Sequence, residues 1–138
     1  MRGQLSYEFV AVWGVMIIFF SGLIVYANNL QAGLGNENGG AQAGALAGVV
    51  AEAISAGSCC EGARSVFTLP ATLSSVGNYS LFVINGSVKV NWTGGDALAV
   101  YTAPRVVNGS GANVTFALSP GFRYEVLNQN RTVVVRRA

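Results

Sequence analysis

An uncharged apolar run dominates the first part of this chain. From Phe9 to Tyr26 the 18 residues carry no charge, and Glu8 stands directly before them. In a helix this length rises about 27 Å, close to the thickness of the hydrocarbon core of a bilayer. Because a carboxylate at bilayer depth is costly unless it has a partner, the position of Glu8 calls for a reason. The run predicts a helix that spans a membrane or is buried on all sides.

The residues before the run form a specific pattern. A short basic leader ends at Gly3, Gln4 follows, and Ser6, Glu8 and Phe9 lead into the apolar run. This order resembles the precursors of archaeal type IV pilins, in which a basic leader with a class III signal ends in Gly and the mature chain begins Gln-x-Ser-x-Glu-Phe. The resemblance implies cleavage between Gly3 and Gln4 by a prepilin peptidase.

The same resemblance implies a structural subunit of an archaeal surface filament that serves adhesion or cell-to-cell contact. The implied partners are identical subunits, the peptidase and an assembly platform, and Glu8 would pair with the N-terminal amine of a neighbouring subunit. Before assembly, Arg2 would keep the N-terminus on the cytoplasmic side of the membrane. The alternatives are a minor or priming pilin, and an uncleaved single-span surface protein that displays a β binding module.

The rest of the chain predicts an α+β protein with three parts after a cleaved leader of residues 1–3. We expect a long helix over residues 4–57, a hinge over 58–64 and an extracellular β domain over 65–138. The domain is predicted to be a small antiparallel sheet or sandwich of about six strands.

Glycine is frequent in the second half of the predicted helix. Residues 33–40 hold four glycines, each costing about 1 kcal/mol relative to Ala, so we expect a kink, a melted segment or a linker there. Gly40, Gly44 and Gly48 then share one helical face. This row is read either as a contact between subunits or as the face that packs on the chain's own β domain. Gly57 is predicted to cap the helix. The residues expected to pack on the opposite face are Leu46, Val49, Val50, Ala53 and Ile54.

The strongest strand signal is Asn85-Gly86 between residues 79–84 and 87–92, which predicts a β-hairpin. Val88 and Val90 alternate with Lys89, so one face of the sheet is expected to be buried and the other wet. By the same alternation, Phe122, Tyr124 and Val126 are expected on the buried face, and Arg123 and Glu125 on the wet face. Further strands are predicted at residues 97–102, 112–118, 122–127 and 132–135.

Acceptor motifs for N-glycosylation are frequent in the predicted β domain. Chance predicts about one Asn-x-Ser/Thr motif for this composition, and none occurs among the four asparagines before residue 78. The motifs therefore predict N-linked glycans on the extracellular part, although Asn-Gly-Ser turns alone would account for two of them. The acceptors are Asn78, Asn85, Asn91, Asn108, Asn113 and Asn130.

The two cysteines, Cys59 and Cys60, are adjacent. Their Cα atoms lie about 3.8 Å apart, below the usual disulfide range, which excludes an unstrained bridge between them. A strained ring, bridges to another chain and two free thiols all remain open. A metal site would need more ligands, and the chain has no histidine.

Nothing in the sequence points to catalysis. Without histidine there is no ordinary catalytic triad, and the acids Glu61, Asp96 and Glu125 are isolated in sequence. The glycines of residues 33–40 lack the Lys-Ser/Thr of a phosphate loop. A net charge of +2 is too small to favour nucleic-acid binding. We therefore expect neither an enzyme nor a cofactor.

Overall fold

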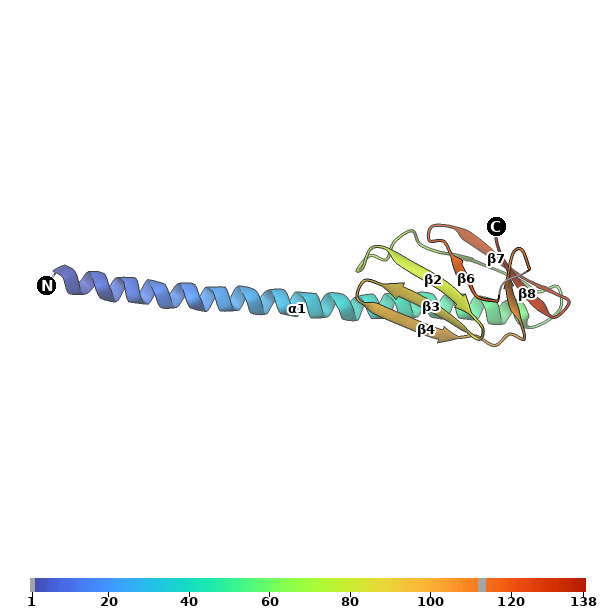
Figure 1. Cartoon of the computed structure of the whole chain (residues 1–138), viewed down its shortest axis with the longest axis horizontal. Helices are drawn as coiled ribbons and strands as arrows, with labels where there is room; N and C mark the ends of the chain where they lie inside the picture. The colour runs from blue at the N-terminus through green and yellow to red at the C-terminus, as the bar shows by residue number, and fades with distance from the viewer. Residues whose placement is uncertain (1, 112–113) are drawn as a thin grey trace. The chain divides into compact units, whose positions relative to one another are not determined.

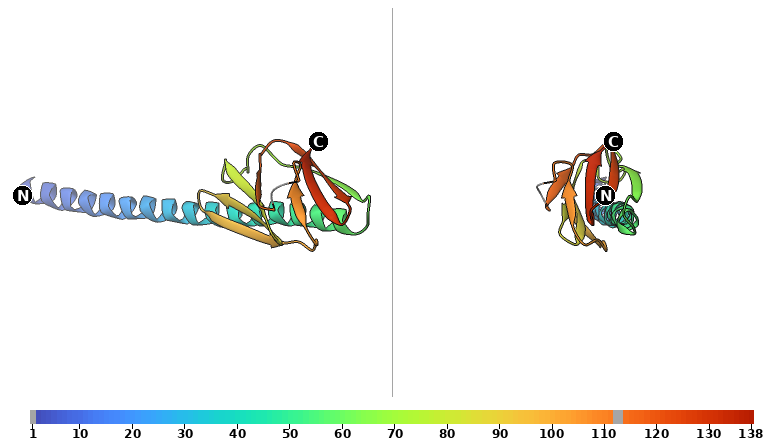
Figure 2. Two further views of the ribbon diagram at one scale, coloured as in Figure 1. Left: turned by 45° about the vertical axis from the view of Figure 1, so that its right-hand side comes forward. Right: turned by 90° about the vertical axis from the view of Figure 1, so that its right-hand side faces the viewer.

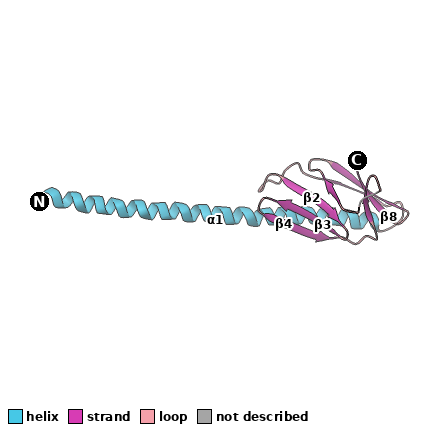
Figure 3. Cartoon of the chain, viewed as in Figure 1, coloured by secondary structure: helices cyan, strands magenta, loops and turns pink. Residues whose placement is uncertain are grey.

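The computed structural model describes the backbone of residues 2–111 and 114–138, and their side chains apart from those of residues 2–6 and 36. This part of the chain folds into helix α1 (Arg2–Ser58) and eight strands in two four-stranded sheets (Figures 1 and 3). The predicted α+β class is confirmed. The chain divides into two compact units, Met1–Gly35 and Asn36–Ala138, which are described separately.

The two sheets have different strand orders, β1-β7-β8-β5 and β4-β3-β2-β6. The strands are β1 (Arg64–Thr68), β2 (Tyr79–Ile84), β3 (Ser87–Trp92), β4 (Gly95–Val100), β5 (Val106–Asn108), β6 (Phe116–Leu118), β7 (Arg123–Gln129) and β8 (Thr132–Arg137). Both views of Figure 2 place strands alongside the C-terminal part of α1.

The β2–β3 hairpin has the bounds and the register that the sequence predicts. Ile84 pairs with Ser87 across the Asn-Gly turn, where Gly86 has a φ of 84°. This left-handed conformation is the one that a two-residue hairpin loop requires and that glycine adopts freely.

Strands β1 and β5 were not predicted, so the described residues form eight strands where about six were expected. Strand β5 is also the parallel exception among the described strand pairs. It has only three residues and runs parallel to β8, with Val106 opposite Val133. Val106 and Val107 are both buried. A strand this short shows no alternation between apolar and polar residues, so its sequence pattern is not recognisable.

Helix α1 continues through residues 33–40, so the expected melted segment or linker was wrong. A Cβ atom on Gly39 would lie 3.1 Å from Cγ2 of Val76 and 3.3 Å from Nε1 of Trp92. The glycine here allows the β domain to come close to the helix. Packing of this kind overrides a weak helix propensity, which is a small term by comparison.

A single hydrophobic cluster joins the helix to both sheets. From α1 it takes Ala43, Ala47, Val50 and Ile54, all fully buried. From the strands it includes the fully buried valines Val83, Val88, Val90, Val126 and Val133. The predicted inward positions of Val88 and Val90 are thus confirmed.

Strand β7 departs from the predicted pattern because it is buried on both faces. Tyr124 and Val126 face the core as expected, but Glu125, expected on the wet face, is only 5% exposed. Arg136 donates to its Oε2 at 2.9 and 3.0 Å, and Arg64 contacts Oε1. Two guanidinium groups neutralise and cover the carboxylate, which makes its burial tolerable.

The end of α1 is also different from the prediction. Gly57, expected to cap the helix, lies inside it, and the helix ends at Ser58. A Cβ atom on Gly57 would lie 2.6 Å from Cγ1 of Val126. Val126 is a stiff, fully buried side chain, so glycine is required here by the closeness of β7.

We expect Gly57→Ala to destabilise the β domain by about 1–3 kcal/mol, because the added methyl group overlaps Val126. Urea unfolding of the full chain in detergent, followed by Trp92 fluorescence in a Trp13→Phe background, measures this. Gly44→Ala is the matched control, since open space surrounds Gly44 and Ala favours the helix. Equal stability of the two variants would contradict the packing described here.

Candidate functional site

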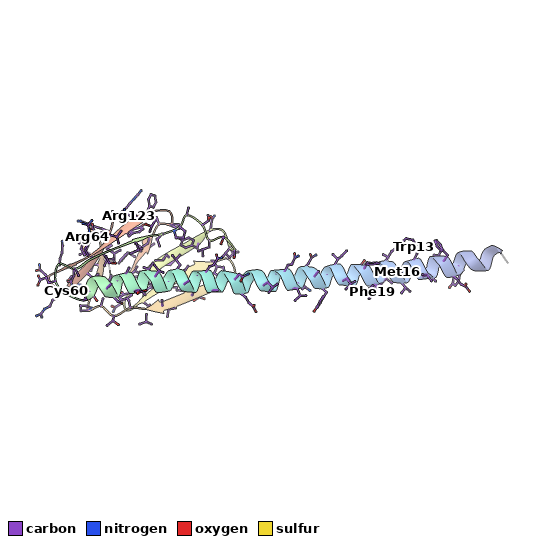
Figure 4. The ribbon with its side chains drawn as sticks, turned by 180° about the vertical axis from the view of Figure 1, so that it is seen from behind. Trp13, Met16, Phe19, Cys60, Arg64 and Arg123 are labelled. Carbon is purple, nitrogen blue, oxygen red and sulfur yellow. The ribbon has the colours of Figure 1, made fainter. Side chains whose placement is uncertain are left out.

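The first candidate is the apolar surface of the N-terminal unit. Every large apolar side chain from Tyr7 to Leu34 is exposed, by between 46% and 79%. Helix α1 is long and apolar enough to cross a membrane, with a mean hydropathy of 2.4 in its most apolar window. Trp13, Met16 and Phe19 project from it in Figure 4. Contiguous exposed apolar surface of this extent marks a site of contact with lipid or protein.

Ser21, a polar residue within the uncharged run, is satisfied locally. The hydroxyl of Ser21 donates to the carbonyl oxygen of Ile17 at 2.7 Å, one turn earlier, so it adds no free donor to the apolar surface. Phe9 and Trp13 meet edge to face, with ring centroids 6.1 Å apart. These contacts are compatible with an apolar environment on all sides of the helix.

Glu8 is the carboxylate that precedes this surface. Gly3 and Gln4, the residues of the predicted cleavage point, belong to the helical backbone. Glu8 is exposed and joins no salt bridge within the described residues. It stands four residues after Gln4 and thus on the same face of the helix. This exposed carboxylate at the edge of an apolar surface is available to a partner from outside the chain.

The predicted glycine row, Gly40, Gly44 and Gly48, borders the outer face of α1. A Cβ atom on Gly44 or Gly48 would have no neighbour within 4 Å, and one on Gly40 would only touch Trp92 at 3.9 Å. Of the residues expected to pack on the opposite face, Val50, Ala53 and Ile54 are buried and Leu46 is partly buried. Val49 is instead 54% exposed and lies on the outer face.

A second row of small residues, which sequence reasoning missed, packs against the β domain. Gly39, Ala43 and Ala47 recur at four-residue spacing and are buried. Both rows consist only of small residues, so side-chain size does not indicate which row packs inward. The sequence signal that could have identified the buried row is its spacing from Val50 and Ile54. These large apolar residues lie three and seven positions after Ala47 and so continue the second row and not the first.

The predicted glycan acceptors fall into three groups. Asn78, Asn85 and Asn130 are exposed. Asn108 is partly buried and accepts a hydrogen bond from Ser110 Oγ at 2.7 Å. Asn91 is partly buried, and its Oδ1 is enclosed without a hydrogen-bond partner. Asn113 lies outside the described residues.

Two acceptor motifs meet in one surface hollow of about 260 Å³ on the β2–β3 pair. Its lining consists of Asn78-Tyr79-Ser80 and Asn91-Trp92-Thr93, which are brought together because Ser80 pairs with Asn91. Tyr79 is anchored below, where its hydroxyl donates to the carbonyl oxygen of Pro70. Burial, with a smaller contribution from Tyr124, raises the pKa of Tyr79 to about 12. Its phenol therefore stays neutral and structural at physiological pH.

The acidic residues of the β domain are engaged in ion pairs. Asp96 lies 3.4 Å from Lys89 across β3 and β4, and Glu125 is held by Arg64 and Arg136. Within the described residues, no three His, Cys, Asp or Glu side chains gather closely enough to hold a metal ion. Searches of protein-family models, curated proteins and solved structures returned no match for this chain.

The exposed apolar surface predicts that Trp13 enters lipid while Trp92 does not. In a Trp92→Phe chain reconstituted into vesicles, bromine-labelled lipid tails should quench the fluorescence of Trp13. Trp13→Phe is the control: it leaves only Trp92, which packs against the core of the β domain and should keep its emission. Equal quenching in the two variants would refute this assignment.

Proposed function

We propose that this chain is a pilin, the structural subunit of an archaeal type IV pilus-like surface filament for adhesion or cell-to-cell contact. The observation that carries the proposal is the contrast within α1. Residues 7–34 expose all their large apolar side chains, whereas residues 39–57 pack into a folded β domain. Surface of the first kind has to leave water, either for lipid or for a bundle of identical helices.

A pilin helix occupies both environments in turn, lipid before assembly and a helix bundle after it. The precursor is held in the cytoplasmic membrane by the apolar helix, with its N-terminus inside and its β domain outside. On assembly the helix moves from lipid into the filament core. Apolar burial changes little in that transfer, so close packing between helices and polar contacts decide whether assembly is favourable.

Two features favour a filament over a simple membrane anchor. The first is the pattern from Gly3 to Phe9, with Glu8 exposed at the edge of the apolar surface. In an apolar bundle this carboxylate needs a partner, and the N-terminal amine released at Gln4 in a neighbouring subunit would supply one. The second is the row at Gly44 and Gly48, where a neighbouring helix can approach without obstruction from the chain's own β domain.

The geometry of assembly follows from these contacts. Each subunit would present a helix face and receive a different surface of its neighbour, so the interface is heterologous and extends as a helical filament. The β domains would form the outer layer. The exposed acceptors Asn78, Asn85 and Asn130 are the positions that suit N-linked glycans on that layer.

The proposal is tested first by the N-terminus of the native protein. We expect intact-mass analysis of purified filaments to show a main component that begins at Gln4. Gly3→Val should leave a heavier precursor that retains Met1-Arg2-Gly3 and stays in the membrane, because a branched side chain does not fit a peptidase site shaped for glycine.

The alternatives give different results in that experiment. An uncleaved single-span surface protein would keep its leader and yield no filaments in electron micrographs. A minor or priming pilin would be cleaved but would be a trace component of the filament. Normal processing of Gly3→Val would reject the cleavage point itself.

Gly44→Leu tests the free glycine row. A Cβ atom at position 44 would have no neighbour within 4 Å, and leucine raises helix propensity by up to about 1 kcal/mol, so the β domain should stay folded. Filament yield should fall strongly, because the side chain separates helices that have to approach closely. Thermal unfolding of the full chain in detergent and electron microscopy of the cells measure the two effects.

Thr72→Leu is the control for this experiment. Thr72 is exposed in the loop between β1 and β2, so this variant also adds a surface leucine, but away from the helix. If the Gly44→Leu and Thr72→Leu variants form filaments equally well, the glycine row of α1 is not a contact between subunits.

A further inference from the structure

The two cysteines form a pair of exposed, touching thiols directly after the end of α1. Both side chains are exposed, and their Sγ atoms lie 3.3 Å apart. Figure 4 shows Cys60 at this end of the helix. The chain has no other cysteine, and the proposed filament function does not use this pair.

The turn that carries the thiols is held on both sides by hydrogen bonds. Ser58 Oγ donates to the carbonyl oxygen of Thr102 at 2.8 Å, and Asn128 Nδ2 donates to that of Ser58 at 3.2 Å. After the cysteines, Gly62 N–H donates to the carbonyl oxygen of Asn128 at 3.0 Å. Because the buried Asn128 fixes both ends of the turn, the backbone presents the two thiols together, which lowers the ordering cost at binding.

This geometry is unfavourable for a disulfide within the pair. The two sulfur atoms would have to approach from 3.3 Å to about 2.05 Å, while adjacent Cα atoms are closer than relaxed disulfides require. Strain of this kind makes a disulfide easily reduced. The pair is therefore better suited to a ligand that accepts the sulfur atoms at their present separation.

A divalent metal ion is also a poor fit. Structural zinc sites have four ligands, and no third His, Cys, Asp or Glu joins the pair among the residues that the structure describes. The hydrogen bond with Cys59, and then the charge of Cys59, raise the pKa of the Cys60 thiol. A simple cation must displace both thiol protons into water, which a raised pKa opposes.

We propose that Cys59 and Cys60 form a bidentate site for trivalent arsenicals, thiophilic compounds that carry two exchangeable hydroxyl groups on arsenic. Two As–S bonds form while two S–H and two As–OH bonds break. Each thiol proton leaves with a hydroxyl group as water, so no electron is transferred and no free proton has to be released.

The separation of the sulfur atoms supports this choice. If As–S bonds are about as long as Zn–S bonds, about 2.3 Å, sulfur atoms 3.3 Å apart subtend an angle of about 90° at the arsenic atom. That angle suits the pyramidal bonding of trivalent arsenic better than the tetrahedral arrangement around zinc or the linear one around soft monovalent ions. Once the first thiol has bonded to arsenic, the second thiol is held next to the same atom, which raises its effective concentration.

Phenylarsine oxide is the probe for this site. The reduced full chain in detergent should bind one equivalent, seen by intact-mass analysis under non-denaturing conditions, and release it to ethanedithiol but not to an equal concentration of a monothiol. Cys59→Ser and Cys60→Ser should each weaken binding on the order of a hundredfold or more, the usual advantage of two linked contacts. Iodoacetamide labelling of the remaining thiol in each variant verifies that it is still exposed.

Three results would overturn the proposal. Either serine variant could bind phenylarsine oxide within a few-fold of the native chain. The isolated native chain could already be two hydrogen masses lighter and inert to the probe, which would show a stable ring. Non-reducing electrophoresis could show copies joined through these cysteines, which would make the site an intermolecular bridge.

Discussion

Helix α1 and the β domain approach each other so closely at two glycines that little or no side chain fits between them. At Gly39 the neighbour is Val76, and at Gly57 it is Val126. Between these points Ala43, Ala47 and the larger Val50 and Ile54 fill the same inner face of the helix. The two sheets share one hydrophobic cluster with this face, so the part of α1 from Gly39 to Gly57 is a structural layer of the domain.

Polar contacts fix the register of this packing at the end of the helix. Asn128 is buried in β7, where its side chain binds the carbonyl oxygen of Ser58 and its backbone binds Gly62 and Ala63. On the same strand, Glu125 joins Arg64 of β1 to Arg136 of β8. A neutral residue at position 125 would leave two arginines without a partner, while an unpaired carboxylate would be costly to bury.

Signals that are local in the sequence predicted the structure well. The uncharged run predicted an apolar helix, and Asn85-Gly86 predicted the hairpin, because both depend on residues that are neighbours in the chain. The register of the helix against the sheets depends on contacts between distant residues. For that reason Gly39 was read as part of a helix breaker and Gly57 as a cap. In the structure Gly39 lets Val76 come close to the helix, and a Cβ atom on Gly57 would overlap Val126.

The candidate sites show the same division. Asn78, Asn85 and Asn130 are exposed, and a Cβ atom on Gly44 or Gly48 would have no neighbour within 4 Å, but the glycans and the contact between subunits stay predictions. The enclosure of Asn91 and the burial of Glu125 do not follow from alternation, since they depend on what covers the outer face of a strand. Likewise, the adjacency of Cys59 and Cys60 was visible in the sequence, but the anchoring of their turn through Asn128 was not.

The continuity of α1 has a mechanical consequence. A pulling force along the axis of α1 loads the stripe that runs from Gly39 to Gly57 inside the β domain. To be extracted, this stripe must slide along the sheets, so its contacts are loaded in shear and resist together. A domain attached by a loop would instead be peeled off one contact at a time. The part of α1 from Gly39 to Gly57 is thus held in the domain by contacts that act together along its whole length.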